Sequence, residues 1–79
     1  MNLHILFFGP LVSHSGSGRI TVDESGIQST HELRTRLETR FPGLAGASYV
    51  MAVNQEISRG DQPLKDDDEV ALLPPYSGG

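Results

Sequence analysis

The group with the clearest chemical potential in this 79-residue chain is its C-terminal carboxylate, which follows two glycines. The last six residues are Pro74, Pro75, Tyr76, Ser77, Gly78 and Gly79. Because Gly78 and Gly79 have no side chains, a narrow channel could close around their backbone and the carboxyl carbon. The five residues from 75 to 79 can extend about 16 Å at ~3.3 Å per residue, and the prolines stiffen the base. The ending therefore indicates a carboxylate that another protein could take into a pocket.

A second arrangement, three serines around His14 in the segment 11–18, could be imagined as a nucleophile with its base. The spacing places no acidic partner, and no elbow motif surrounds any of these serines. We therefore expect a flexible Gly/Ser-rich connection here, without a firm element and without catalysis. A stand-alone hydrolase would keep its turnover after deletion of Gly78 and Gly79, whereas a mechanism that uses the terminal carboxylate would lose it.

Metal sites find little support in the sequence. The chain has no cysteine, which excludes disulfides and thiolate ligands, and its three histidines are far apart in sequence. The acidic run 65–69 lacks the glycine and glutamate spacing of a calcium loop. We expect no bound metal and no bound cofactor.

Charge and hydropathy limit the possible partners. The formal net charge is -4, and the basic residues form no run, so a nucleic-acid partner is not expected. The longest apolar run, residues 5–8, is too short to span a bilayer, and no signal-peptide pattern is present. These features, with the lack of cysteine, predict a cytoplasmic protein that does not enter a membrane.

The pattern of apolar residues predicts a small α+β domain. Strands are expected at residues 2–8, 19–23, 48–53, 57–59 and 69–73. One helix is expected from residue 30 to about 41, because Ser29 and Glu32 form a capping box and Pro42 follows. We expect one domain over residues 1–75 and a flexible tail over 76–79.

A single helix can cover only one face of such a sheet. The residues that we expect in the core are Leu3, Ile5, Phe7, Ile20, Val22, Leu33, Leu37, Phe41, Val50, Leu64, Val70 and Leu72. The opposite face retains Leu6, Phe8, Ile57 and Leu73. An apolar face of this kind on a small domain usually marks a binding surface, so the sequence predicts a protein partner.

Five stretches, taken together, resemble the MoaD/ThiS family of ubiquitin-like sulfur carriers, and within it the small subunit of molybdopterin synthase. They are Ile5-Leu-Phe-Phe-Gly9, the helix 30–41, Ala52-Val-Asn-Gln-Glu56, the segment 64–70, and Leu72-Leu-Pro-Pro-Tyr-Ser-Gly-Gly79. The ending is the most specific of the five. One departure is that the family often has a short helix after its first strand, whereas Ser13 to Gly18 is short, polar and Gly-rich.

The resemblance implies a ubiquitin-like β-grasp fold, with a mixed sheet of four or five strands and one main helix on one face. It also implies that an E1-like adenylyltransferase uses ATP to adenylate the Gly79 carboxylate. A sulfur donor enzyme then converts the adenylate into a thiocarboxylate, a 1-thioglycine. By the same resemblance, we expect a sulfur donor with no activity alone, which acts within a heterotetramer with the large subunit of molybdopterin synthase.

The resemblance also implies which residues contact the large subunit. Phe8, Ile57 and Leu73 lie at contact positions, and they are among the residues that the strand pattern leaves uncovered. The tail that brings Gly79 to the large subunit, and that contacts this partner, consists of Pro74, Pro75, Tyr76 and Ser77. Gly78 precedes the reacting Gly79. Three alternatives stay open: a sulfur carrier for thiamine or another pathway, a ubiquitin-like protein modifier, and a tail without chemistry.

Overall fold

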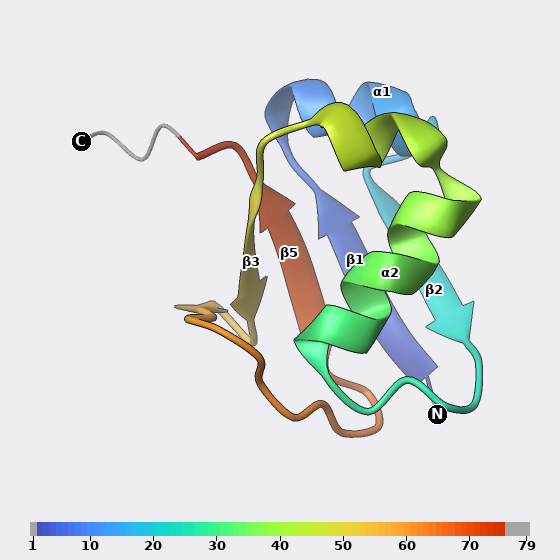
Figure 1. The fold of residues 1–79 in the computed structure, drawn as a ribbon, viewed down its shortest axis with the longest axis vertical. Coiled ribbons are helices and arrows are strands. Elements are labelled where there is room, and N and C mark those ends of the chain that lie inside the picture. The colour runs from blue at the N-terminus through green and yellow to red at the C-terminus, as the bar shows by residue number, and fades with distance from the viewer. Residues whose placement is uncertain (1, 76–79) are drawn as a thin grey trace.

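The computed structural model describes residues 2–75, which form one five-stranded mixed sheet with helices on one side (Figure 1). The strands are β1 (Asn2–Phe7), β2 (Arg19–Asp23), β3 (Val50–Val53), β4 (Glu56–Ile57) and β5 (Glu69–Leu73). The helices are the 3-10 turn η1 (Gly9–Leu11), α1 (Val12–Ser15), α2 (Thr30–Arg40) and the 3-10 segment η2 (Pro42–Gly46). This architecture confirms the predicted β-grasp fold, with one main helix on a mixed sheet.

The last strand lies in the middle of the sheet, whose order is β2-β1-β5-β3-β4. β5 pairs in parallel with β1, with Ile5 opposite Val70, and antiparallel with β3, with Val53 opposite the same Val70. A parallel pair needs a long crossover between its strands, and α2 lies within the connection from β1 to β5. The chain therefore leaves its central strand at Leu73, directly before the two prolines.

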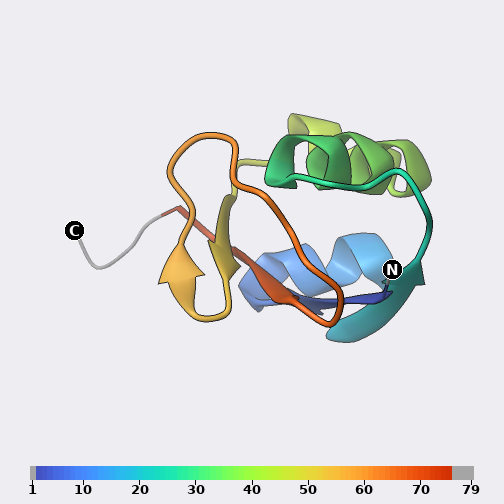
Figure 2. The ribbon, with the colours of Figure 1, turned by 90° about the horizontal axis from the view of Figure 1, so that it is seen from below.

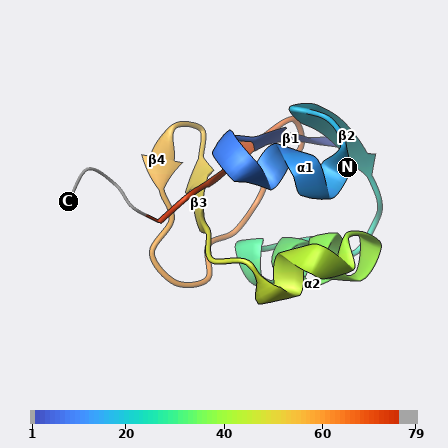
Figure 3. The same cartoon turned by 90° about the horizontal axis from the view of Figure 1, so that it is seen from above.

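α2 begins at the predicted cap and packs on the sheet through one stripe. Ser29 Oγ accepts a hydrogen bond from Glu32 N (3.3 Å), and Glu32 Oε1 accepts one from Gln28 N (2.9 Å). Leu33 and Leu37 are buried. Figures 2 and 3 show α2 along one face of the sheet, with α1 on that same side, so we call this the inner face.

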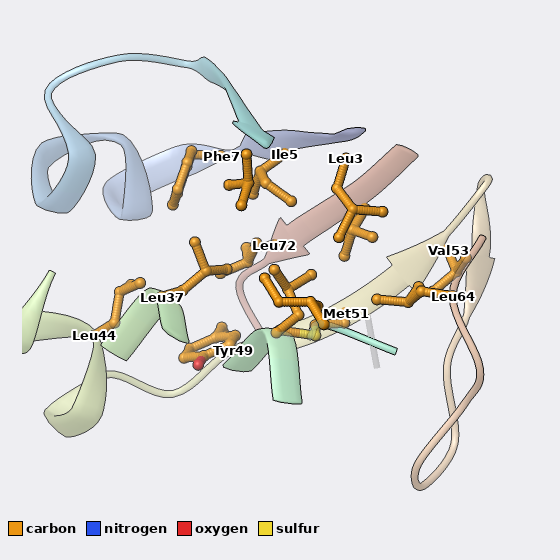
Figure 4. Close-up of a cluster of buried hydrophobic side chains, with 14 of the residues drawn as sticks. Leu3, Ile5, Phe7, Leu37, Leu44, Tyr49, Met51, Val53, Leu64 and Leu72 are labelled. Carbon is orange, nitrogen blue, oxygen red and sulfur yellow. The ribbon is translucent and has the colours of Figure 1, made fainter. Parts of the chain in front are cut away.

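The core confirms most of the predicted residues and corrects one register (Figure 4). Val50 is only half-buried, whereas Tyr49, Met51 and Val53 are buried, so the prediction that Val50 faces the core is wrong. The larger side chains of β3 fill the space under α2, and alternation turns Val50 to the other face. Ile20 and Phe41 are partly buried and pack against the core. The core also holds residues that the sequence analysis left out: Leu11, Ile27 and Leu44.

The segment 11–18 is more ordered than expected, because η1 and α1 occupy most of it. Pro10 lies in the first turn of η1, where its fixed φ favours a helix start, and Leu11 is buried. The His14 ring packs closely over η2, since a Cβ placed on Gly43 would lie 2.6 Å from His14 Nδ1. The expected flexible connection is therefore wrong, and the short helix that the family resemblance implies after the first strand is present. The sequence did not predict α1, because a single helical turn has too few residues to show a helical period.

Candidate functional site

The base of the C-terminal tail is held between the end of β5 and the turn that follows β1. Phe8 N donates to Leu72 O (3.1 Å), which extends the parallel pairing by one residue. Gly9 has a φ of 57°, and a Cβ placed on it would lie 3.1 Å from Pro74 Cγ, so the turn passes close to the first proline. Pro74 is half-buried and Pro75 is exposed. The chain thus leaves the sheet along a defined surface of the molecule.

The residues predicted to do the chemistry follow this point directly. Tyr76, Ser77, Gly78 and Gly79 lie outside the described residues, so their predicted roles and the flexible-tail prediction stay predictions. What residues 2–75 provide is the surface beside the departure point of the tail.

That surface is the face of the sheet opposite to α2, which we call the outer face. One row crosses four strands through cross-strand pairs, running Leu6, Ala71, Ala52 and Ile57. The next row, at the end where the chain leaves the sheet, contains Leu73 opposite Val50, with Phe8 following β1 beside it. Cross-strand neighbours on one face lie about 4.5–5.5 Å apart, so these side chains form one continuous apolar surface. We define the docking face as Leu6, Phe8, Val50, Ala52, Ile57, Ala71 and Leu73.

Two members of the docking face are strongly exposed. Phe8 is 44% and Ile57 52% accessible to solvent, whereas Leu6 and Leu73 are half-buried by their neighbours. The structure therefore confirms that Phe8, Ile57 and Leu73 share the uncovered face. The half-buried Val50 and Ala71 and the buried Ala52 are further members of this face. The period-two pattern would have identified Val50 if the register of β3 had been anchored on the larger Tyr49 and Met51.

A charged rim borders the opposite end of the docking face. His4 Nε2 lies 3.5 Å from Asp67 Oδ1, and Arg19 Nη2 lies 3.3 Å from His4 Nδ1. Asp67 belongs to the acidic turn 65–69. Across residues 2–75 the structure places no cluster of His, Asp or Glu that could hold a metal ion. In the same part of the chain, no helix is long and apolar enough for a bilayer crossing.

The only strong pKa shift among the described residues lies on the inner side, at the edge of β3. Burial, together with the hydrogen bond that Tyr49 OH donates to Glu38 Oε2 (2.7 Å), raises the pKa of Tyr49 above its usual value. The Arg34 guanidinium carbon lies 4.6 Å from the centroid of the Tyr49 ring. These contacts tie α2 to β3 beside an open crevice of about 320 Å³, and they are not part of the docking face.

The N-terminus of α2 holds a second group with a shifted pKa. Asp61 Oδ1 accepts a hydrogen bond from His31 N (3.0 Å), and this bond lowers the pKa of the Asp61 carboxyl. A carboxylate in this place also complements the positive end of the helix dipole. Asp61 thus holds the loop after β4 against the start of α2.

The chain is similar over nearly its full length to proteins of known name. The chain is 34% identical to the molybdopterin synthase sulfur carrier subunit of Homo sapiens, over 98% of this chain and 93% of that protein. It is 32% identical to the protein of the same name from Chlamydomonas reinhardtii, over the full length of both.

Solved structures support the same fold. A putative molybdopterin converting factor subunit 1 from Pyrococcus furiosus matches with a TM-score of 0.86 at 19% identity, over 96% of this chain and 99% of that one. A complex of subunits 1 and 2 of the molybdopterin-converting factor from Helicobacter pylori 26695 contains a chain that matches at 28% identity and a TM-score of 0.71, with both chains fully covered. The sequence model of the ThiS family matches residues 5–79. The chain therefore belongs to the ThiS family.

Proposed function

We propose that this chain is the sulfur carrier subunit of a molybdopterin synthase, and that its Gly79 carboxyl group carries the sulfur. The observation that supports this most is the position of the docking face. One of its two rows, with Phe8 and Leu73, lies at the point where the chain leaves the central strand toward Gly79. A partner that covers this face receives the tail on the same side.

The proposed chemistry has three steps. A carboxylate oxygen of Gly79 attacks the α-phosphorus of ATP on an E1-like adenylyltransferase, which gives the acyl adenylate and releases pyrophosphate. Hydrosulfide supplied by a sulfur donor enzyme then attacks the acyl carbon, AMP leaves, and a thiocarboxylate remains. The thiocarboxylate sulfur finally attacks a carbon of the pterin precursor, and water hydrolyses the resulting thioester, which leaves the sulfur on the precursor and restores the carboxylate. This chain supplies only the acyl group, so it has no activity alone.

The large subunit is the partner in the third step. The Helicobacter pylori complex joins subunits 1 and 2 of the molybdopterin-converting factor, and its matching chain covers all of this one. We infer that the docking face binds the corresponding large subunit, in a heterotetramer. Phe8, Ile57 and Leu73 are the expected anchors, because a few large side chains usually carry most of the binding energy of an interface, and Phe8 and Ile57 are the large apolar side chains that are exposed.

Intact mass after activation tests the carrier role. The chain is incubated with its activating enzyme, ATP and a sulfur source. A mass gain equal to one sulfur-for-oxygen exchange is expected, and a chain that lacks Gly78 and Gly79 is the matched control without any gain. Gly79→Ala is expected to fold like the wild type and to deliver no sulfur to the large subunit. Normal delivery by that variant would contradict the tail mechanism. Larger conjugates without the exchange would instead indicate a protein modifier.

A further inference from the structure

The turn between β3 and β4 is tied to the acidic turn by one residue, Asn54. Its backbone N donates to Glu69 O (2.7 Å), and its side-chain Oδ1 accepts from Glu69 N (3.0 Å). Its Nδ2 donates to Asp68 Oδ1 (2.9 Å). Three polar groups of one exposed residue are therefore committed to the segment that begins β5. The family motif Ala52–Glu56 contains this residue, yet neither the tail chemistry nor the docking face gives it a role.

The acceptor of the third bond is itself fixed. Asp68 Oδ2 accepts from Lys65 N (2.8 Å), and Asp68 N donates to Lys65 O (3.1 Å). Asp68 O accepts from His4 N (3.0 Å), which joins the acidic turn to β1. Asn54 thus anchors the β3–β4 turn to a point that is held by the centre of the sheet.

The hairpin needs such an anchor because it is short and strained. β4 makes only two pairs with β3, between Ala52 and Ile57 and between Val53 and Glu56. Its turn places Asn54 at φ 49° and Gln55 at φ 73°. Asparagine tolerates this region, whereas glutamine adopts it at a cost of about 1–2 kcal/mol. An isolated two-stranded hairpin is only marginally stable in water, so two pairs with this turn would open readily.

We propose that Asn54 is a positioning residue for partner binding, because it holds Ile57 on the docking face. Ile57 lies three residues after Asn54, on the edge strand, and its pairing in the hairpin places it in the row with Ala52 and Ala71. When the hairpin opens, the most exposed anchor of the docking face leaves the surface. This inference rests on the proposed binding of the large subunit through that face.

The test begins with Asn54→Asp, a nearly isosteric change that keeps the acceptor for Glu69 N and the tolerance of positive φ. It removes the Nδ2 donor and places a carboxylate against Asp68. The affinity for the large subunit that co-purifies with the chain, measured by calorimetry, should fall about tenfold. Exchange of the Ser58 amide hydrogen should become faster, because Ser58 N donates to Met51 O only while the hairpin is closed (2.8 Å).

A swap of the two partners provides the matched control. In the double variant Asn54→Asp with Asp68→Asn, the side chain at 68 becomes the donor and the side chain at 54 the acceptor, while the net charge is unchanged. The remaining carbonyl oxygen at 68 can still accept from Lys65 N. Affinity and amide protection should return to within about twofold of the wild type. Persistent loss in the swap would overturn the role of this hydrogen bond.

A double-mutant cycle with Ile57→Ala separates positioning from general destabilisation. If Asn54 acts through Ile57, Asn54→Asp should cost about tenfold in affinity in the wild-type background and almost nothing when Ile57 is already alanine. If Asn54→Asp lowers the affinity equally in both backgrounds, or does not lower it in the wild-type background, the inference is overturned. The proposed function would still stand in that case if Ile57→Ala alone weakens binding. If neither the wild type nor any variant binds the large subunit, the proposed function fails and this inference fails with it.

Discussion

Both faces of the central strands are apolar, yet α2 covers only one of them. On the inner face, Ile5 and Leu72 have no measurable exposure, whereas on the outer face Phe8 keeps 44% of its surface in contact with solvent. The two sets alternate along the same strands, so local sequence and β propensity are alike for both. What differs is the neighbour: α2 buries the inner set, and among residues 2–75 no helix lies over the outer set (Figure 2).

This difference assigns different roles to adjacent residues. Full burial of a leucine or isoleucine side chain contributes about 1.5–3 kcal/mol, so the inner face supplies much of the stability of a small domain. The outer face leaves apolar area in contact with solvent. Such a surface marks a site of protein interaction, and it makes a free subunit prone to aggregate. Neighbouring residues therefore allow stability and binding to be varied separately.

The largest expected effect comes from the adjacent pair Leu72 and Leu73. Leu72→Ala removes a fully buried side chain and should lower the free energy of unfolding by about 3 kcal/mol. Leu73→Ala acts at a half-buried position on the outer face and should lower it by less than about 1 kcal/mol. Urea denaturation measures both values, and similar values for the two variants would contradict the assignment of the faces.

The reverse ranking is expected for binding. Phe8→Ala and Leu73→Arg should weaken binding to the large subunit about 10- to 100-fold, because they remove or charge anchors of the docking face. The melting temperature should change little, since neither side chain supports the core. Calorimetric titration on the folded protein checks the affinity. A collapse of the melting temperature with unchanged affinity would show that the faces are inverted.

The sequence was sufficient for the strong periodic signals. Alternation in β1 and β5 correctly separated Ile5 and Leu72 from Phe8 and Leu73, and Ser29 with Glu32 located the start of α2. These predictions succeed because a buried face or a helix cap imposes its own chemistry on a short stretch of chain.

The parts that failed depend on contacts between distant segments. In β3, apolar residues occupy both faces, so alternation alone could not decide between Val50 and Met51; the space beneath α2 decides it. η1 and α1 form because Leu11 enters the core and His14 packs over Gly43, and neither contact has a local signature. The bonds of Asn54 join segments 14 and 15 residues apart. Such tertiary contacts override weak local propensities.

Tyr49→Phe should affect stability alone, because Tyr49 supports the inner side and is absent from the docking face. Loss of the bond to Glu38 should lower the free energy of unfolding by about 1 kcal/mol near neutral pH. The pKa of Tyr49 is raised in the folded protein, so the unfolded chain ionises first. The contribution of Tyr49 to the free energy of unfolding is therefore full below about pH 10, the ordinary tyrosine value. It is lost as the pH rises toward the pKa of Tyr49 in the folded protein. Unfolding of Tyr49→Phe should therefore depend less on pH above about 10. An unchanged alkaline slope, or a loss of affinity for the large subunit, would contradict this role.

The smallest effect is expected from Asp61→Asn, which removes a charge far from the docking face. Asparagine can still accept from His31 N, so the variant isolates the charge at the start of α2. The bond from His31 N lowers the pKa of Asp61 in the folded protein. The contribution of the Asp61 carboxylate to stability is therefore present above about pH 4, the ordinary carboxyl value. It is lost as the pH falls through the pKa of Asp61 in the folded protein. The variant should melt slightly below the wild type at pH 7, and the difference should vanish in acid, where Asp61 is protonated. Affinity for the large subunit should not change at any of these pH values. A change in that affinity would show that residues at the start of α2 contribute to binding as well as to stability.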